Sequence, residues 1–109
     1  MNVRKLINEV LILVKLTGTF IRAELGKVDS DDIETKAMNS LVSYVDKEAE
    51  RMLVEGLSKI LPGSGFITEE DTKDDISKES IWIIDPLDGT TNFLRQIPHF
   101  SVSVALEVN

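Results

Sequence analysis

Two stretches of the chain repeat apolar residues at the three-and-four spacing of an amphipathic helix. The first runs from Val3 to Leu25, and Gly26 directly after it can take the left-handed conformation that ends a helix. The second begins near Ser43, with Asp46 three residues on, a pairing that favours capping of the first free amides. It stops at Pro62-Gly63. The pattern predicts two long helices, the first with a stripe that forms core or subunit interface.

Beyond the second helix the chain changes to short runs of β-branched and aromatic residues. Gly65–Thr68 and Ile81–Ile84 are such runs, and apolar and polar residues alternate from Phe100 to Val108 as in a half-buried strand. The acid-rich stretch Asp71–Ser80 is expected to be an exposed connection, and Lys27–Lys36 a solvated loop or a weakly ordered hairpin. The order of elements predicts an α/β (α+β) fold.

Size and charge narrow the class of protein. With 109 residues, residues 1–109 are expected to form one domain, and a formal charge of −7 disfavours nucleic acid and anionic membranes as partners. The apolar run Val10–Val14 is far shorter than the ~20 residues of a membrane span. Cysteine is absent, which excludes thiolate chemistry and is compatible with the cytoplasmic location that we expect.

Two aspartates follow the strand Ile81–Ile84 directly. That strand delivers Asp85 to its carboxyl end, Pro86 is expected to turn the chain, and Asp88 returns to the same place. Two carboxylates held so close repel each other unless a cation bridges them, and a hard divalent ion such as Mg²⁺ suits oxygen ligands. The carbonyl of Leu87 is a candidate for a further ligand.

The residues after Asp88 are suited to bind phosphate. Gly89 allows close approach of the backbone, and Thr90 or Thr91 is expected to cap a brief helical turn whose amides face an anion. Asp-Pro and Asp-Gly also occur in ordinary surface turns, and paired glutamates are usually solvated. Glu69 and Glu70, however, follow another strand, and two acid clusters at strand ends favour a metal site.

The segment Trp82-Ile-Ile-Asp85-Pro-Leu-Asp88-Gly-Thr-Thr-Asn-Phe93 is similar to the signature of the inositol monophosphatase family. Gly65–Glu70 resembles the glutamate element of that family, and Val45–Glu50 its early aspartate on the second helix. Ile97–Ala105 resembles the strand after the signature, so the resemblance covers nearly the whole chain.

The resemblance implies a layered αβαβα sandwich of the sugar-phosphatase type, of which this chain forms the first half. It implies two or three Mg²⁺ ions, with Mn²⁺ as a substitute, bound by Glu69, Asp85, Asp88 and the Leu87 carbonyl. Asp46 and Thr90 then help to activate the attacking water, with Glu69 also catalytic, and residues 89–91 bind the phosphate. A homodimer that hydrolyses a small polyol phosphate, foremost inositol monophosphate, is the implied function.

Departures from the family pattern leave alternatives open. Ser40 stands where the family usually has an acid, which weakens the case for an additional metal, and Lys36 and His99 are expected to be solvated or structural. The chain is also still alternating at Asn109, so we expect that the protein continues. The resemblance implies that this continuation supplies another metal-binding aspartate. The alternatives are a nucleotide 3′-phosphatase, a fructose-1,6-bisphosphatase, or a metal-binding fragment without catalysis.

Overall fold

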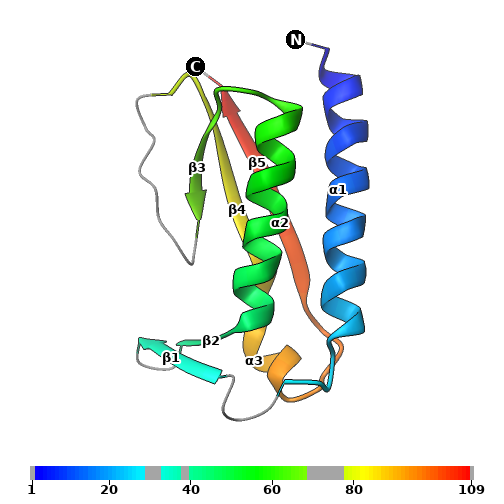
Figure 1. Ribbon diagram of the computed structural model, residues 1–109, viewed down its shortest axis with the longest axis vertical. Helices are drawn as coiled ribbons and strands as arrows, with labels where there is room; N and C mark the ends of the chain where they lie inside the picture. The colour runs from blue at the N-terminus through cyan, green and yellow to red at the C-terminus, as the bar shows by residue number, and fades with distance from the viewer. Residues whose placement is uncertain (1, 29–32, 38–39, 69–77, 109) are drawn as a thin grey trace.

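The structure is a computed structural model, and it describes residues 2–28, 33–37, 40–68 and 78–108. Two long helices and a short one alternate with two small sheets (Figure 1). The elements in chain order are α1 (Val3–Ala23), β1 (Ile33–Ala37), β2 (Ser40–Ser43), α2 (Tyr44–Ile60), β3 (Gly65–Thr68), β4 (Ser80–Asp88), α3 (Thr90–Leu94) and β5 (Ser101–Val108).

The larger sheet has the strand order β3-β4-β5, with β3 parallel and β5 antiparallel to β4. Helices α1 and α2 lie beside each other against one face of it (Figure 1). Alternate strand residues face the helices: Trp82 and Ile84 of β4 are buried against Leu53 and Leu57 of α2. Trp82, expected to belong to the core, is only 2% exposed. A helix layer on a mixed sheet confirms the expected α/β class.

Helix α1 begins where its sequence predicts and ends two residues earlier than predicted. Asn2 caps its first turn by accepting a hydrogen bond from the Lys5 amide at 3.1 Å. At the other end Gly26 has φ +84°, as expected of a residue that stops a helix. The helix proper ends at Ala23, because the backbone conformation changes after Glu24.

The apolar stripe of α1 is divided between two environments. Six members of the stripe pack on the core clusters: Leu6, Val10, Leu13, Val14, Phe20 and Ile21. Val3 and Ile7, in contrast, are 57% and 51% exposed. Both line a groove of about 470 Å³ between α1 and the helix-facing side of β5, together with Val108. The sequence pattern therefore identified the helix but not how far the sheet extends beneath it.

Contact between the two long helices depends on a glycine. A Cβ atom at Gly56 of α2 would lie 2.6 Å from both terminal methyl groups of Leu13 on α1. Gly18 of α1, in contrast, has open space where a Cβ would stand. Within the described residues, no helix is long and apolar enough to cross a membrane.

The polar stretch after α1 was expected to be either a solvated loop or a hairpin. The smaller sheet is that hairpin. Strands β1 and β2 pair antiparallel with Ile33 opposite Ser43, and the ladder is irregular between Thr35 and Ala37. Lys36 lies in β1. Figure 1 places this hairpin near the end of the molecule that carries α3. Residues 69–77, which include most of the expected connection Asp71–Ser80, lie outside the described part of the chain.

Candidate metal and phosphate site

A bulge in β4 brings its two aspartates to the same face of the sheet. Asp85 lies opposite Ser103 and Asp88 opposite Ser101, so two residues of β4 stand opposite the single residue Val102. Residues three apart in a regular strand point to opposite faces, whereas Ser101 and Ser103, two apart, share one. The inserted residue therefore aligns both carboxylates on the face away from α1 and α2.

The bulge replaces the turn that the sequence predicted at Pro86. Strand β4 continues to Asp88 instead of ending at Ile84, and Pro86 and Leu87 are both buried. A proline has no amide hydrogen to offer a ladder, and a bulge is one of the few places in a sheet where that donor is not needed. The expectation of a turn was wrong, and the bulge instead places both aspartates on one face of the strand.

Asp46 is buried, 2% exposed, at the start of α2. One of its carboxylate oxygens, Oδ2, accepts hydrogen bonds from the backbone amide and the hydroxyl of Ser43, both at 3.0 Å. The Ser43 hydroxyl oxygen in turn accepts from the Val45 amide at 3.2 Å. This arrangement is the capping box that the sequence predicted, and it fixes Asp46 at the end of the helix nearest the hairpin.

Thr90 joins Asp46 to the bulged strand. Its hydroxyl lies 2.8 Å from Asp46 Oδ1 and 3.0 Å from the carbonyl oxygen of Leu87. A threonine hydroxyl has one hydrogen, so it donates to one of these acceptors at a time. The two residues that the family resemblance assigned to water activation, 44 positions apart in sequence, are thus in direct contact.

The turn after the bulge differs in one respect from expectation. Gly89, and not a threonine, is the N-cap of α3, with φ +96° and no side-chain hydrogen bond to the cap. A Cβ atom there would lie 2.9 Å from the carbonyl oxygen of His99, so the close approach at Gly89 is made by the chain's own backbone. Thr90 cannot serve as the cap because its hydroxyl is directed to Asp46 and Leu87.

A hollow of about 380 Å³ lies beside the bulge. It is lined by Asp88, Gly89, Asn92, Pro98, His99, Phe100 and Ser101. The Asn92 side chain donates to the His99 carbonyl at 2.9 Å and holds the two walls of the hollow together. His99 and Thr91 are exposed, so both are accessible from solvent next to the aspartates.

The other predicted metal ligands are only partly covered by the structure. Glu69 and Glu70 lie outside the described residues, and within residues 2–28, 33–37, 40–68 and 78–108 no group of three His, Cys, Asp or Glu side chains is close enough to hold a metal. Asp85, Asp88 and the Leu87 carbonyl together offer hard oxygen donors, which Mg²⁺ prefers. The chemistry of these donors fits Mg²⁺.

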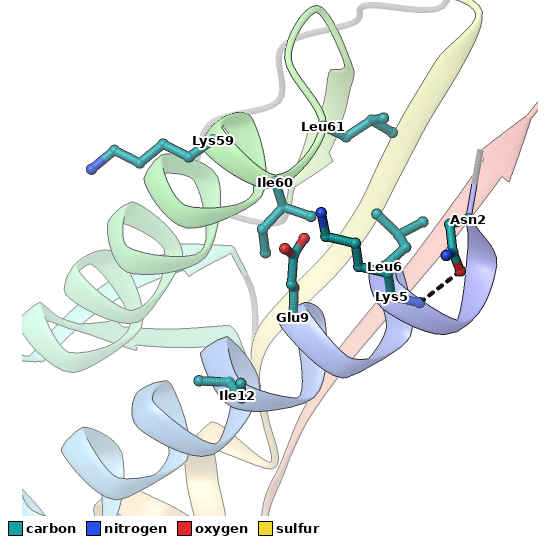
Figure 2. A pocket seen from close by; sticks show the side chains of 8 residues that line it. All are labelled: Asn2, Lys5, Leu6, Glu9, Ile12, Lys59, Ile60 and Leu61. Atoms are coloured by element: carbon teal, nitrogen blue, oxygen red, sulfur yellow. Dashed lines mark hydrogen bonds between the residues drawn. The ribbon is translucent and has the colours of Figure 1, made fainter.

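A larger hollow lies elsewhere. Figure 2 shows a groove of about 730 Å³ where the first turns of α1 meet the end of α2, with Lys5, Glu9 and Lys59 around it. Asp46 lies at the opposite end of α2, ~20 Å away by the rise of a 17-residue helix. The groove is therefore separate from the acidic site.

The charged side chains whose pKa values are shifted also lie outside the acidic site. On the exposed face of α2, a hydrogen bond from Arg51 lowers the pKa of Glu48, and the same bond raises the pKa of Arg51. The Arg51 guanidinium also contacts Glu55 at 2.6 Å. These are surface pairs on α2.

Fold and site together define an α/β protein with an acidic strand bulge suited to a divalent cation. The inositol monophosphatase family model matches residues 3–109. The inositol-1-monophosphatase of Rhizobium meliloti (strain 1021) is 41% identical over 103 residues, which cover 94% of this chain and 39% of that protein. The fructose-1,6-bisphosphatase/inositol-1-monophosphatase of Aquifex aeolicus (strain VF5) is 36% identical over 105 residues, covering 96% and 40%.

A solved structure agrees with these sequences. The extragenic suppressor protein suhB from Bartonella henselae matches with a TM-score of 0.82 at 34% identity, covering 95% of this chain and 40% of that one. This chain belongs to the inositol monophosphatase family. It spans about two fifths of the length of the curated relatives it matches.

Proposed function

We propose that this chain carries the Mg²⁺ site of a phosphatase that hydrolyses a small phosphate monoester, with inositol monophosphate as the preferred substrate. The observation that supports this most strongly is the junction of Asp46, Thr90 and the bulged strand in a member of this family. Because the chain spans two fifths of the length of its relatives, its activity and its substrate are proposals.

We assign the metal ligands to the bulge. Asp85, Asp88 and the Leu87 carbonyl, with Glu69, would hold two or three Mg²⁺ ions, for which Mn²⁺ can substitute. When bound, such ions lower the pKa of a coordinated water and stabilise charge on the phosphoryl oxygens. The alignment of both aspartates on one face supports this assignment.

We assign orientation of the attacking water to Asp46 and Thr90. The Asp46 carboxylate can only accept hydrogen bonds when ionised, so a Thr90 hydroxyl that donates to Oδ1 keeps its lone pairs for a donor on its other side. A water that donates to Thr90 would be held with its oxygen lone pair free for attack on phosphorus. Glu69 is proposed as a second catalytic carboxylate.

The substrate phosphate is proposed to lie at the start of α3. Backbone amides of Gly89, Thr90 and Thr91 have the direction that favours an anion at a helical turn. The hollow beside Asp88 leaves this segment open to solvent. The remaining walls for the polyol are expected from the part of the relatives that this chain does not match.

The test is a phosphate-release assay with inositol 1-phosphate, at graded Mg²⁺ and with a chelator. We expect release that requires Mg²⁺, that is lost in Asp88→Asn, and that persists in the control Glu107→Gln, whose exposed side chain lies on the same sheet face away from the bulge. Release that is indifferent to chelator, or equal loss in both variants, would contradict the proposal. Metal binding with no release at any substrate concentration would favour a metal-binding fragment.

A second substrate is favoured by one observation. The Aquifex aeolicus relative has a name that includes fructose-1,6-bisphosphatase, at 36% identity. Comparison of kcat/KM for fructose 1,6-bisphosphate and inositol 1-phosphate decides between them. A ratio in favour of the sugar bisphosphate would reassign the substrate and leave the metal site unchanged.

We also propose that the protein is cytoplasmic and that it forms a homodimer, of which the family resemblance implies the second. Sedimentation equilibrium should give twice the 12.2 kDa mass of this chain. The chain mass alone would contradict the dimer.

A further inference from the structure

Ser43 has two structural roles at once. It is the last residue of β2, paired with Ile33 of β1, and it is the N-cap of α2. Its side chain is buried, 1% exposed. The position of Ser43 is therefore fixed from the hairpin on one side and from the helix on the other.

The hydroxyl of Ser43 does more than an N-cap requires. In a capping box the cap side chain accepts from the first helix amides, and the acid three residues on accepts from the cap amide. Ser43 fulfils both conditions, and its hydroxyl hydrogen is directed in addition to Asp46 Oδ2 at 3.0 Å. Two donors from one residue thus occupy the same carboxylate oxygen.

The consequence is a fixed rotation of the Asp46 carboxylate. The terminal torsion of an aspartate is broad and soft, so its two oxygens exchange places easily unless they are held. With Oδ2 held by Ser43, Oδ1 is left to face the Thr90 hydroxyl at 2.8 Å. We propose that Ser43 is a positioning residue, which holds Asp46 so that Oδ1 accepts the Thr90 hydrogen and Thr90 is kept ready for the attacking water.

The effect of Ser43 on phosphate release rests on the proposed function. Its effect on the orientation of the Asp46 carboxylate does not. The variants are Ser43→Ala, which removes the hydroxyl, and Ser43→Thr, which restores it. Asn2→Ala is the matched control, because it removes the N-cap side chain of α1, far from Asp46. Ser43→Gly removes the same hydroxyl at a smaller loss of helix stability and serves if Ser43→Ala does not fold.

The first readout is NMR of the intact chain. We expect the Asp46 carboxyl carbon and the Thr90 methyl group to change their chemical shifts in Ser43→Ala, to return in Ser43→Thr, and to stay unchanged in Asn2→Ala. If both signals stay at their wild-type positions in Ser43→Ala and Ser43→Gly, Ser43 is a helix cap only and the proposal is overturned.

The second readout is phosphate release. Loss of one orienting hydrogen bond should lower kcat about tenfold with KM unchanged in Ser43→Ala. Ser43→Thr should recover most of the rate, and Asn2→Ala should keep the wild-type rate. An unchanged kcat in Ser43→Ala contradicts the positioning role. If the wild-type chain itself releases no phosphate, the proposed function fails, and the NMR readout still decides the role of Ser43.

Discussion

Replacement of Asp46 separates its structural role from its chemical one. In Asp46→Ala the backbone amide of Ser43 is buried without an acceptor, because it cannot rotate to find another. An unsatisfied buried donor costs about 1–3 kcal/mol, and loss of a negative charge at a helix N-terminus adds about 0.3–1 kcal/mol. The free energy of unfolding should therefore fall by about 1.3–4 kcal/mol.

Asp46→Asn should destabilise the protein much less. Its remaining oxygen can keep both Ser43 hydrogen bonds if its amide group faces Thr90. Thr90 then accepts from that amide and turns its own hydrogen to the Leu87 carbonyl, 3.0 Å away. Only the charge is lost, so the expected cost is about 1 kcal/mol. The reversed Thr90 hydroxyl uses one of its two lone pairs for that amide and would hold a water in a different direction, so phosphate release should fall.

The assay is urea unfolding followed by the fluorescence of Trp82, which is buried and should report loss of the core. Asp88→Asn, an exposed aspartate, is the control and should stay within about 0.5 kcal/mol of wild type. Equal stabilities of Asp46→Ala and Asp46→Asn would refute the reasoning, because only Asp46→Ala should leave the Ser43 amide without an acceptor.

Other substitutions test the fold at single positions. Gly89→Ala should lower the free energy of unfolding in urea by about 2–4 kcal/mol, because the position combines a positive φ with a 2.9 Å approach of the backbone. Gly63→Ala should lower it by only about 1 kcal/mol, because this position has φ +84° but open space around it. Gly18→Ala should stabilise α1 by about 0.5–1 kcal/mol. In Gly56→Ala the added methyl group would clash with Leu13, and this clash should offset the same gain. Equal gains in the two variants would contradict the helix contact. The pKa of Glu48 is lowered in the folded state by its hydrogen bond to Arg51. The stabilisation that Glu48 contributes is therefore present above its pKa in the unfolded state, and it is lost as the pH falls through its pKa in the folded state. Thermal unfolding of Glu48→Gln and wild type should thus differ slightly at neutral pH and coincide in acid, and the difference should vanish in 1 M salt.

Local patterns in the sequence were sufficient for most of the elements. The helices followed from apolar spacing, and the box at Ser43 from residue types three positions apart, because these interactions lie within one turn of chain. The strand β5 was predicted from the alternation of its residues, since one of its faces is half-buried. Such features depend on neighbours in sequence, which a single chain reveals.

The geometry of the site depended on distant partners. A proline between two aspartates favours a turn locally, but pairing with β5 kept the strand extended and converted the extra residue into a bulge. The contact of Thr90 with Asp46 joins residues 44 positions apart, and no local pattern predicts it. It agrees with the shared role that the family resemblance implied. Sequence chemistry thus located the acids, while tertiary pairing determined how they face each other.

The central claim, that the bulge of β4 binds a divalent cation, can be measured without any substrate. Mn²⁺ added to the isotope-labelled chain broadens NMR signals near its binding site, and Mg²⁺ should compete with it. We predict that broadening is centred on Asp85 to Thr90, is reversed by Mg²⁺, and is lost in Asp88→Asn but kept in Glu107→Gln. Broadening centred on the exposed acids of α2, or unaffected by Asp88→Asn, would contradict the account.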